Sequence, residues 1–312
     1  MTLDDENQVI ENGSIYVEGR KIVAVGDVPP DLNPDRTIDA RGSVVMPGFI
    51  NTHHHLYSTF ARGFTPPGTP ATNFEEILGK LWWKLDRALN HDDVYYSSLL
   101  ALMDGVRAGC TTIIDHHASP SCVDGSLDHV ERAFRDVGLS GCLCYEVTDR
   151  NVEGEGIEEN VRYIGKCQES GDSQMTALLG MHAQMTLGDR TLRRCAEAGA
   201  SLDAGFHVHV AEDSCDVRDA RENHRKGIME RLVDAGITGP RSIFVHGVHL
   251  EEEAMEQLRD TDTILVKCPE SNMNNAVGIA PVLDMIDRGV TIGLGTDGMS
   301  SHMISQARAM YM

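Results

Sequence analysis

Short apolar runs alternate with helical segments along most of the chain. Helical periodicity appears at 93–108, 126–137, 157–168, 189–200, 217–235, 251–259 and 279–288. The apolar runs of strand length are VVMPGFINTH, CTTIIDHH, GLSGCLCYEV, MTALLGMHA, GFHVHVAE, SIFVHGVHL, DTILVKCPESN and VTIGLGTDG. Strands that alternate with helices indicate βαβ units and a parallel sheet. Eight such units predict an α/β fold, the (β/α)8 TIM barrel.

The first 46 residues follow a different pattern. The stretch SIYVEGRKIVAVG contains two alternating runs around a Gly-Arg turn, and RTIDARGSVVMPG adds another strand signal. These strands are too few for a stable sandwich of their own. We therefore predict a small, incomplete β-sandwich domain over residues 1–46, followed by the barrel over residues 47–312.

Charge and hydropathy exclude several kinds of partner. The chain of 312 residues has 48 acidic and 27 basic residues, a formal net charge of −21. Such a charge repels nucleic acids and anionic membranes, so we expect neither as a partner. No apolar run reaches the length of a membrane span, and the acidic start lacks the features of a signal peptide. A cytoplasmic protein is the expectation, and self-association into a homo-oligomer stays open.

Polar residues that suit catalysis fall at the carboxyl ends of the apolar runs. In a barrel these ends meet at one mouth, where active sites lie. Histidines that merely pack in the core would not favour one end of each strand. The residues at these ends are His53, His55, His116, His117, His182, His209, Glu212, His246, Glu270, Asn272 and Asp297.

The spacing of the first histidines indicates a metal site. Side chains alternate along a strand, so His53 and His55 share a face and His54 points the other way. His209 on the fifth run and Asp297 on the eighth bring the number of nitrogen and oxygen donors to four. This donor set suits zinc or ferrous iron and leaves one position for water. We expect one divalent ion, with zinc favoured over iron.

Five ordered motifs carry a resemblance to a known family. PGFINTHHH, HVHVAE, HGVHL, PESNMNNAVGIAPV and GLGTDG resemble the amidohydrolase superfamily, in particular its branch of cytosine, guanine and S-adenosylhomocysteine deaminases and triazine hydrolases. The stretches NFEEILGKLWWKLD, DHHASP and CYEVTDR look closer still to the SsnA group of aminohydrolases.

The resemblance implies a role for each residue that matches a family motif. His53, His55, His209 and Asp297 match the metal ligands, and Glu212 matches the carboxylate that moves protons. His246 matches the histidine that steadies the reacting water, and His182 matches a substrate contact. Two-metal members use a carboxylated lysine after the fourth strand; the chain has no lysine between Lys166 and Lys226, which favours a single metal.

The implied activity is the hydrolytic deamination of a small amino-substituted N-heterocycle such as a purine or pyrimidine. An alternative is the removal of chloride or an alkylamine from a triazine-like ring by the same site. A second alternative is a metal-binding barrel without turnover. The presence of Glu212, His246 and Asp297 argues against that last reading, because metal storage needs no positioned acid.

Weaker signals concern the substrate and the chain ends. Arg62, Trp82, Glu270 and Asn272 are further candidates for substrate contacts, and the tryptophan could stack on a flat ring. His207 is interpreted as a core histidine one layer below His209. Family members continue past the eighth strand with a helix and further sandwich strands. Because Met312 follows Asp297 by only 15 residues, we expect these elements to be missing.

Overall fold

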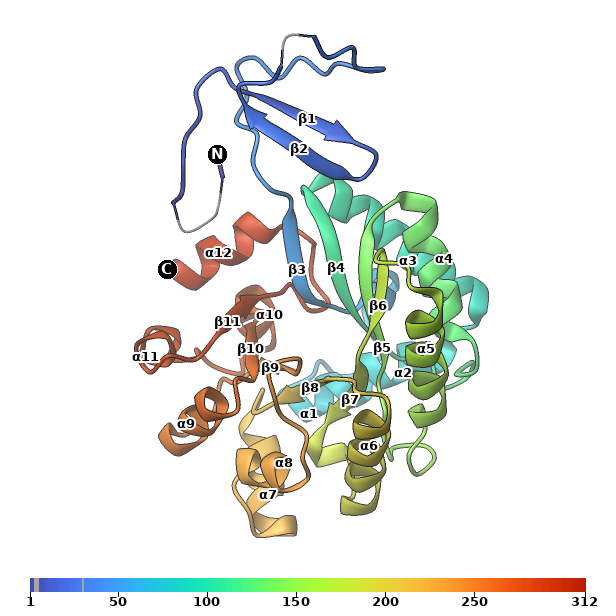
Figure 1. Ribbon diagram of the computed structural model, residues 1–312. Coiled ribbons are helices and arrows are strands. Elements are labelled where there is room, and N and C mark those ends of the chain that lie inside the picture. The colour runs from blue at the N-terminus through green and yellow to red at the C-terminus, as the bar shows by residue number, and fades with distance from the viewer. Residues whose placement is uncertain (3–5, 30) are drawn as a thin grey trace. The chain divides into compact units, whose positions relative to one another are not determined.

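The computed structural model describes residues 1–2, 6–29 and 31–312 (Figure 1). It divides into two compact units, Met1–Gly48 and Phe49–Met312. Among the described residues, no helix is both long and apolar enough to cross a membrane.

The first unit contains an antiparallel hairpin. β1 (Ser14–Glu18) pairs with β2 (Lys21–Gly26) around Gly19, whose φ of +59° suits a residue without a side chain. This confirms the two runs read on either side of the Gly-Arg turn. The strand signal in RTIDARGSVVMPG is wrong, because residues 36–48 form no strand and Val44 is 75% exposed. Apolar alternation alone does not make a strand when its backbone has no partner strand.

The second unit has an α/β fold of the TIM-barrel type. One sheet has the order β3-β4-β5-β6, and the other has the order β11-β10-β9-β8-β7. All of their pairings are parallel. The strands are β3 (Phe49–His54), β4 (Cys110–His117), β5 (Ser140–Tyr145), β6 (Met175–Ala177), β7 (Leu179–Ala183), β8 (Phe206–Val210), β9 (Ile243–His246), β10 (Ile264–Lys267) and β11 (Ile292–Leu294).

The eight predicted runs are all present as parallel strands. Only Leu178 separates β6 from β7, so these two strands together form the fourth run. Isolated parallel bridges link the two sheets on both sides, one between His54 and Asp297 and the other between Val147 and Met181. The first strand begins at Phe49 rather than Val44, since Phe49 is the first residue to pair with β4.

Helices connect the strands and lie outside the sheets (Figure 1). The connecting helices are α3 (His91–Arg107), α4 (Ser126–Val137), α5 (Ile157–Ser170), α6 (Asp189–Ser201), α7 (Ser214–His224), α8 (Ile228–Asp234), α9 (Glu252–Asp260) and α11 (Val282–Asp287). The segment predicted as one helix over 217–235 is two helices, because Arg225 has a left-handed φ of +54° and ends α7. Strand residues such as Leu179, Val208 and Phe244 are fully buried against this layer.

Shorter helices lie at the carboxyl ends of the strands. They are η1 (Leu56–Ala61), α1 (Phe74–Ile77), η2 (Leu78–Trp82), α2 (Trp83–Ala88), η3 (Gln184–Thr186) and α10 (Pro269–Asn275). After β11 the chain forms α12 (Met303–Tyr311), so the expectation that the last helix is missing is wrong. The His302 side chain caps α12 by accepting a hydrogen bond from the Ser305 amide at 3.1 Å.

Candidate metal centre and substrate pocket

The four side chains expected to bind metal meet at the mouth of the barrel. His53 and His55 come from the end of β3, His209 from β8, and Asp297 from the turn after β11. The Nε2 atom of His55 lies 3.1 Å from Nε2 of His209 and 3.2 Å from Oδ1 of Asp297. Nε2 of His53 lies 3.6 Å from the same carboxylate oxygen. Donors at this spacing from three separate strands can surround one ion.

Hydrogen bonds fix which ring nitrogen of each histidine is free. Nδ1 of His55 donates to the carbonyl oxygen of His116 at 2.6 Å, and Nδ1 of His209 donates to that of His182 at 2.7 Å. Each Nε2 atom is therefore the ring nitrogen that faces the centre. Burial would lower the pKa of His55, but contact with Asp297 raises it to about 9, so an ion bound here would displace a proton from Nε2. Nε2 of His53 is buried and has no hydrogen-bond partner among the described residues. Bare imidazole nitrogens beside a carboxylate fit a divalent metal such as zinc.

Asp297 is held as a carboxylate in a strained backbone position. Its φ of +54° is left-handed, and its Oδ2 atom accepts a hydrogen bond from the Ser271 hydroxyl. Burial would raise the pKa of Asp297, but contact with His53 and His55 holds this pKa well below its usual value. His54 points away from the centre, and its Nδ1 atom hydrogen-bonds the carbonyl oxygen of Asp297. Strain of this kind is common where a side chain must be aimed at a reacting group.

Glu212 lies beside this cluster, in surroundings that favour its protonated form. Burial raises the pKa of the Glu212 carboxyl well above its usual value, and the negative charge of Asp297 adds to this effect. Its Oε2 atom lies 3.4 Å from Nε2 of His246, and its Oε1 atom accepts a hydrogen bond from Asn275 at 3.4 Å. A protonated carboxyl next to a pocket can act as a general acid.

His246 is the second predicted catalytic group at this edge of the mouth. Its Nδ1 atom donates to Oδ1 of Asn272 at 2.9 Å, so its Nε2 atom is free to accept a proton or a hydrogen bond. Burial lowers the pKa of His246 to about 4, which keeps the ring neutral. The ring nitrogens of His246 and His116 also lie close enough to the cluster to bind an ion. The possible ligands therefore form two groups that share His209. One group is His53, His209, His246 and Asp297, and the other is His55, His116 and His209.

A pocket of about 620 Å³, including its open mouth, lies over the cluster. Tyr57, Phe74, Trp82 and Trp83 supply an aromatic wall, and His182, one of the expected substrate contacts, also lines it. Trp82 was likewise expected there from the sequence.

Three other predicted substrate contacts lie elsewhere. Arg62 pairs with Asp104 of α3, and Glu270 accepts hydrogen bonds from Ser305 and Gln306 of α12. Asn272 orients His246 instead of lining the pocket. The prediction that Arg62, Glu270 and Asn272 contact substrate is therefore not supported by their positions, because other side chains already bind their polar groups.

Several site residues escaped the sequence analysis. Glu146 follows β5 and lines the pocket, and Ser271 and Asn275 hold the two carboxyls. Glu146 sits in the run GLSGCLCYEV at a strand end, so the rule that pointed to the other polar strand ends would have found it. His116 turns into the cluster, whereas His117 turns away and hydrogen-bonds Ser119 at 2.9 Å.

Comparison with known proteins identifies the family. The model of the amidohydrolase family matches residues 44–312. The chain belongs to the amidohydrolase family. A 5-methylthioadenosine/S-adenosylhomocysteine deaminase of Thermoanaerobacter pseudethanolicus is 30% identical over 305 residues, which cover 97% of this chain and 68% of that protein. Members of this family are hydrolases that act on carbon–nitrogen bonds other than peptide bonds and bind a divalent metal.

Solved structures share the amidohydrolase fold at low sequence identity. An adenosine deaminase from Xanthomonas campestris with bound zinc superposes with a TM-score of 0.80 at 20% identity, over 97% of this chain and 69% of that one. A triazine hydrolase from Arthrobacter aurescens superposes with a TM-score of 0.81 at 23% identity, over 96% and 70% of the two chains. At these identities the likeness concerns the fold alone.

Proposed function

We propose that this amidohydrolase deaminates an amino-substituted N-heterocycle, releasing ammonia, with one zinc ion held by His53, His55, His209 and Asp297. The observation that carries this proposal is the position of Glu212, which lines the pocket beside four converged metal donors and lies 3.4 Å from His246. His55 is preferred to His246 as the third imidazole, because Nε2 of His55 lies 3.1 and 3.2 Å from two other donors.

The reaction replaces an amino group on a ring carbon by oxygen. A divalent metal, when bound, makes a water molecule acidic enough to ionise near neutral pH. Asp297, held as a carboxylate, accepts one proton from the reacting water. Glu212 donates its proton to the ring nitrogen next to the attacked carbon, so that negative charge does not build up on the ring. The amino group takes up the proton held by Asp297 and leaves as ammonia. The new hydroxyl on the ring carbon returns its proton to Glu212 and becomes the carbon–oxygen double bond.

The remaining residues position and protect the reactants. The free Nε2 atom of His246 can accept a hydrogen bond from the reacting water, on the side of the cluster where Glu212 lies. Trp82 and Trp83 supply flat apolar faces for a heterocycle, and burial of the cluster excludes bulk water. The named activity of the Thermoanaerobacter relative, deamination of adenosine derivatives, supports an aminopurine as the heterocycle.

The test is a substrate panel with the metal-loaded protein. Aminopurine nucleosides, guanine, aminopyrimidines and aminotriazines are assayed for ammonia, chloride and alkylamine. We expect ammonia from at least one aminopurine, loss of this activity after chelation, and its recovery with zinc. Release of chloride or alkylamine without ammonia would replace the proposal by the triazine-hydrolase alternative. No product from any compound would favour a barrel that binds metal without turnover.

A further inference from the structure

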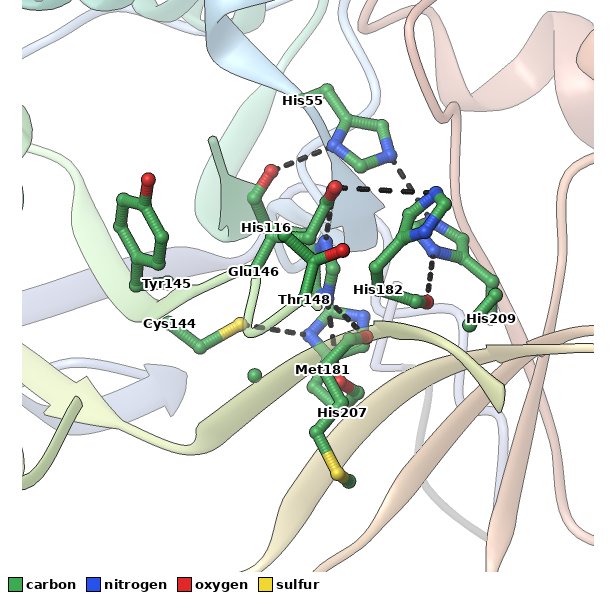
Figure 2. A network of polar contacts seen from close by, with 12 residues as sticks. His55, His116, Cys144, Tyr145, Glu146, Thr148, Met181, His182, His207 and His209 are labelled. Atoms are coloured by element: carbon green, nitrogen blue, oxygen red, sulfur yellow. Dashed lines mark hydrogen bonds and ion pairs between the residues drawn. The ribbon is translucent and has the colours of Figure 1, made fainter. Parts of the chain in front are cut away.

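A second buried carboxylate faces the pocket, on the side away from Glu212. Glu146 follows β5, is 4% exposed and lines the same pocket as the metal donors. Figure 2 shows it between His116 and His182. Its Oε2 atom lies 3.5 Å from Nδ1 of His116, and its Oε1 atom lies 3.9 Å from Nε2 of His182. Glu212, by contrast, contacts His246 at the end of β9 and Asn275 of α10.

Glu146 is fixed as an anion. Its Oε1 atom lies 3.2 Å from a guanidinium nitrogen of Arg150, which also binds Asp86 at 2.9 Å and lies over the ring of Trp83. Burial would raise the pKa of Glu146, but its histidine neighbours and Arg150 hold this pKa below its usual value. As a carboxylate paired with Arg150, Glu146 is a hydrogen-bond acceptor in the pocket wall.

His182 presents a second acceptor next to it. The Thr186 hydroxyl donates its single hydrogen to the carbonyl oxygen of Ala183 at 2.9 Å, so its oxygen must accept from Nδ1 of His182 at 2.7 Å. The Nε2 atom of His182 then carries a lone pair and no proton. Burial lowers the pKa of His182 to about 4, in keeping with a neutral ring. The 3.9 Å between Nε2 and Glu146 is too long for a hydrogen bond between them.

We propose that Glu146 and His182 form a subsite that binds a pair of neighbouring hydrogen-bond donors on the substrate. Among the described residues, Arg150 donates to Glu146 from one side, and no hydrogen bond is formed to Nε2 of His182. A substrate with two donors can hydrogen-bond both acceptors from the pocket side. The donors are either the vicinal hydroxyls of a ribosyl group or the N–H edge of a free base. This inference adds a substrate-binding subsite to the proposed function and rests on it, because both place the substrate in the same pocket.

The test measures equilibrium binding of compounds that cannot be deaminated. One pair is purine riboside and its 2′,3′-dideoxy analogue, and the other is hypoxanthine and its N-methylated form. In each pair the second compound lacks the hydrogen-bond donors of the first. Each compound is titrated into the metal-loaded wild type, Glu146→Gln and Glu153→Gln. Glu153 is the control because its carboxylate pairs with Arg190 at the surface. His182→Phe is the second variant, should Glu146→Gln fail to fold.

We expect wild type to bind the donor-bearing member of one pair at least about tenfold more tightly, as befits hydrogen bonds to a charged group. The pair that shows this difference identifies the ribosyl or the base as the donor source. In Glu146→Gln and His182→Phe the difference should shrink below about threefold, whereas Glu153→Gln should keep it. The subsite is refuted if neither pair differs, if no compound binds, or if the difference survives in both site variants.

Binding and turnover separate this inference from the proposed function. A donor-dependent difference without ammonia release from any substrate would leave the subsite standing and remove the deaminase activity. Ammonia release, together with equal binding of the two members of each pair, would support the deaminase activity and refute the subsite.

Discussion

Nδ1 of His53 lies 2.8 Å from Nε2 of His207, in the core beneath the proposed metal ligands. The other two imidazole ligands donate to backbone carbonyl oxygens, so His53 alone depends on a side chain for its orientation. His207 is fully buried, and its own Nδ1 atom lies 3.6 Å from the thiol of Cys144 (Figure 2). The histidine that the sequence placed in the core therefore supports the metal centre directly.

Replacing His207 should weaken metal binding without touching a ligand. We expect His207→Phe to lower zinc affinity by about 10- to 100-fold, the usual cost of losing a hydrogen bond to a metal-binding histidine. His207→Gln, whose oxygen can accept from His53, should recover part of this loss. Competition with a chelator gives the affinities, and His117→Phe is the control because His117 turns away from the cluster. Unchanged zinc affinity in His207→Phe would show that His53 needs no such partner.

Gly295 allows β3 and the turn after β11 to approach at the site. A Cβ atom there would lie 2.8 Å from the Cβ atom of His53 and 2.9 Å from its backbone nitrogen and oxygen. Gly295→Ala should therefore displace His53 and lower both zinc affinity and the melting temperature. Gly165→Ala on α5 is the matched control, since a Cβ atom there meets nothing within 4 Å. Calorimetry gives the melting temperature of each variant, and zinc titration gives its zinc affinity. Equal values for Gly295→Ala and Gly165→Ala would show that the close approach at Gly295 is unimportant.

The stability of the metal-free protein should fall as the pH is lowered from 7 to 5. A histidine with a folded pKa below its unfolded value of about 6.5 stabilises the fold only above that value, because the unfolded chain takes up protons first. Burial lowers the pKa of His53, His54, His117, His182, His207, His209 and His246. Burial has the opposite effect on a carboxyl and raises the pKa of Asp115, Glu212 and Asp216. His55 opposes the trend as well, because contact with Asp297 outweighs burial and raises its pKa to about 9.

The seven histidines with a lowered pKa outnumber these four opposing groups, so the net proton uptake on unfolding is positive over this range as a whole. Each net proton changes the free energy of unfolding by about 1.4 kcal/mol per pH unit. Thermal unfolding of the chelator-treated protein at half-unit steps of pH measures this slope. A melting temperature that stays constant or rises on acidification would contradict the buried, neutral state of these rings.

Much of the barrel and its metal centre could be predicted because the decisive signals are local. Alternating strands and helices define βαβ units, and parallel topology then brings the strand ends to one mouth. His53, His209 and Asp297 are therefore brought together without any knowledge of packing. The end of α7 at Arg225 was missed because one residue with a left-handed backbone leaves little trace in a periodic pattern.

The substrate contacts were harder to predict because they depend on distant partners. Arg62 binds Asp104, and Glu270 binds residues of α12. Each of these partners lies more than 30 positions away along the chain. Conversely, Glu146 stays charged only because Arg150 and two histidines surround it. Packing decides whether a polar residue is hydrogen-bonded to its neighbours or free to bind a ligand. Composition and spacing along the chain do not reveal this packing.

The most direct test of the proposed deamination is the activity and metal content of Glu212→Gln. Glutamine keeps the shape of the side chain but cannot supply the proton that burial and Asp297 retain on Glu212. We predict about one equivalent of zinc per chain in both wild type and variant, with kcat for ammonia release lowered at least ~10²-fold in the variant. Full ammonia release by Glu212→Gln with its metal bound would contradict the mechanism.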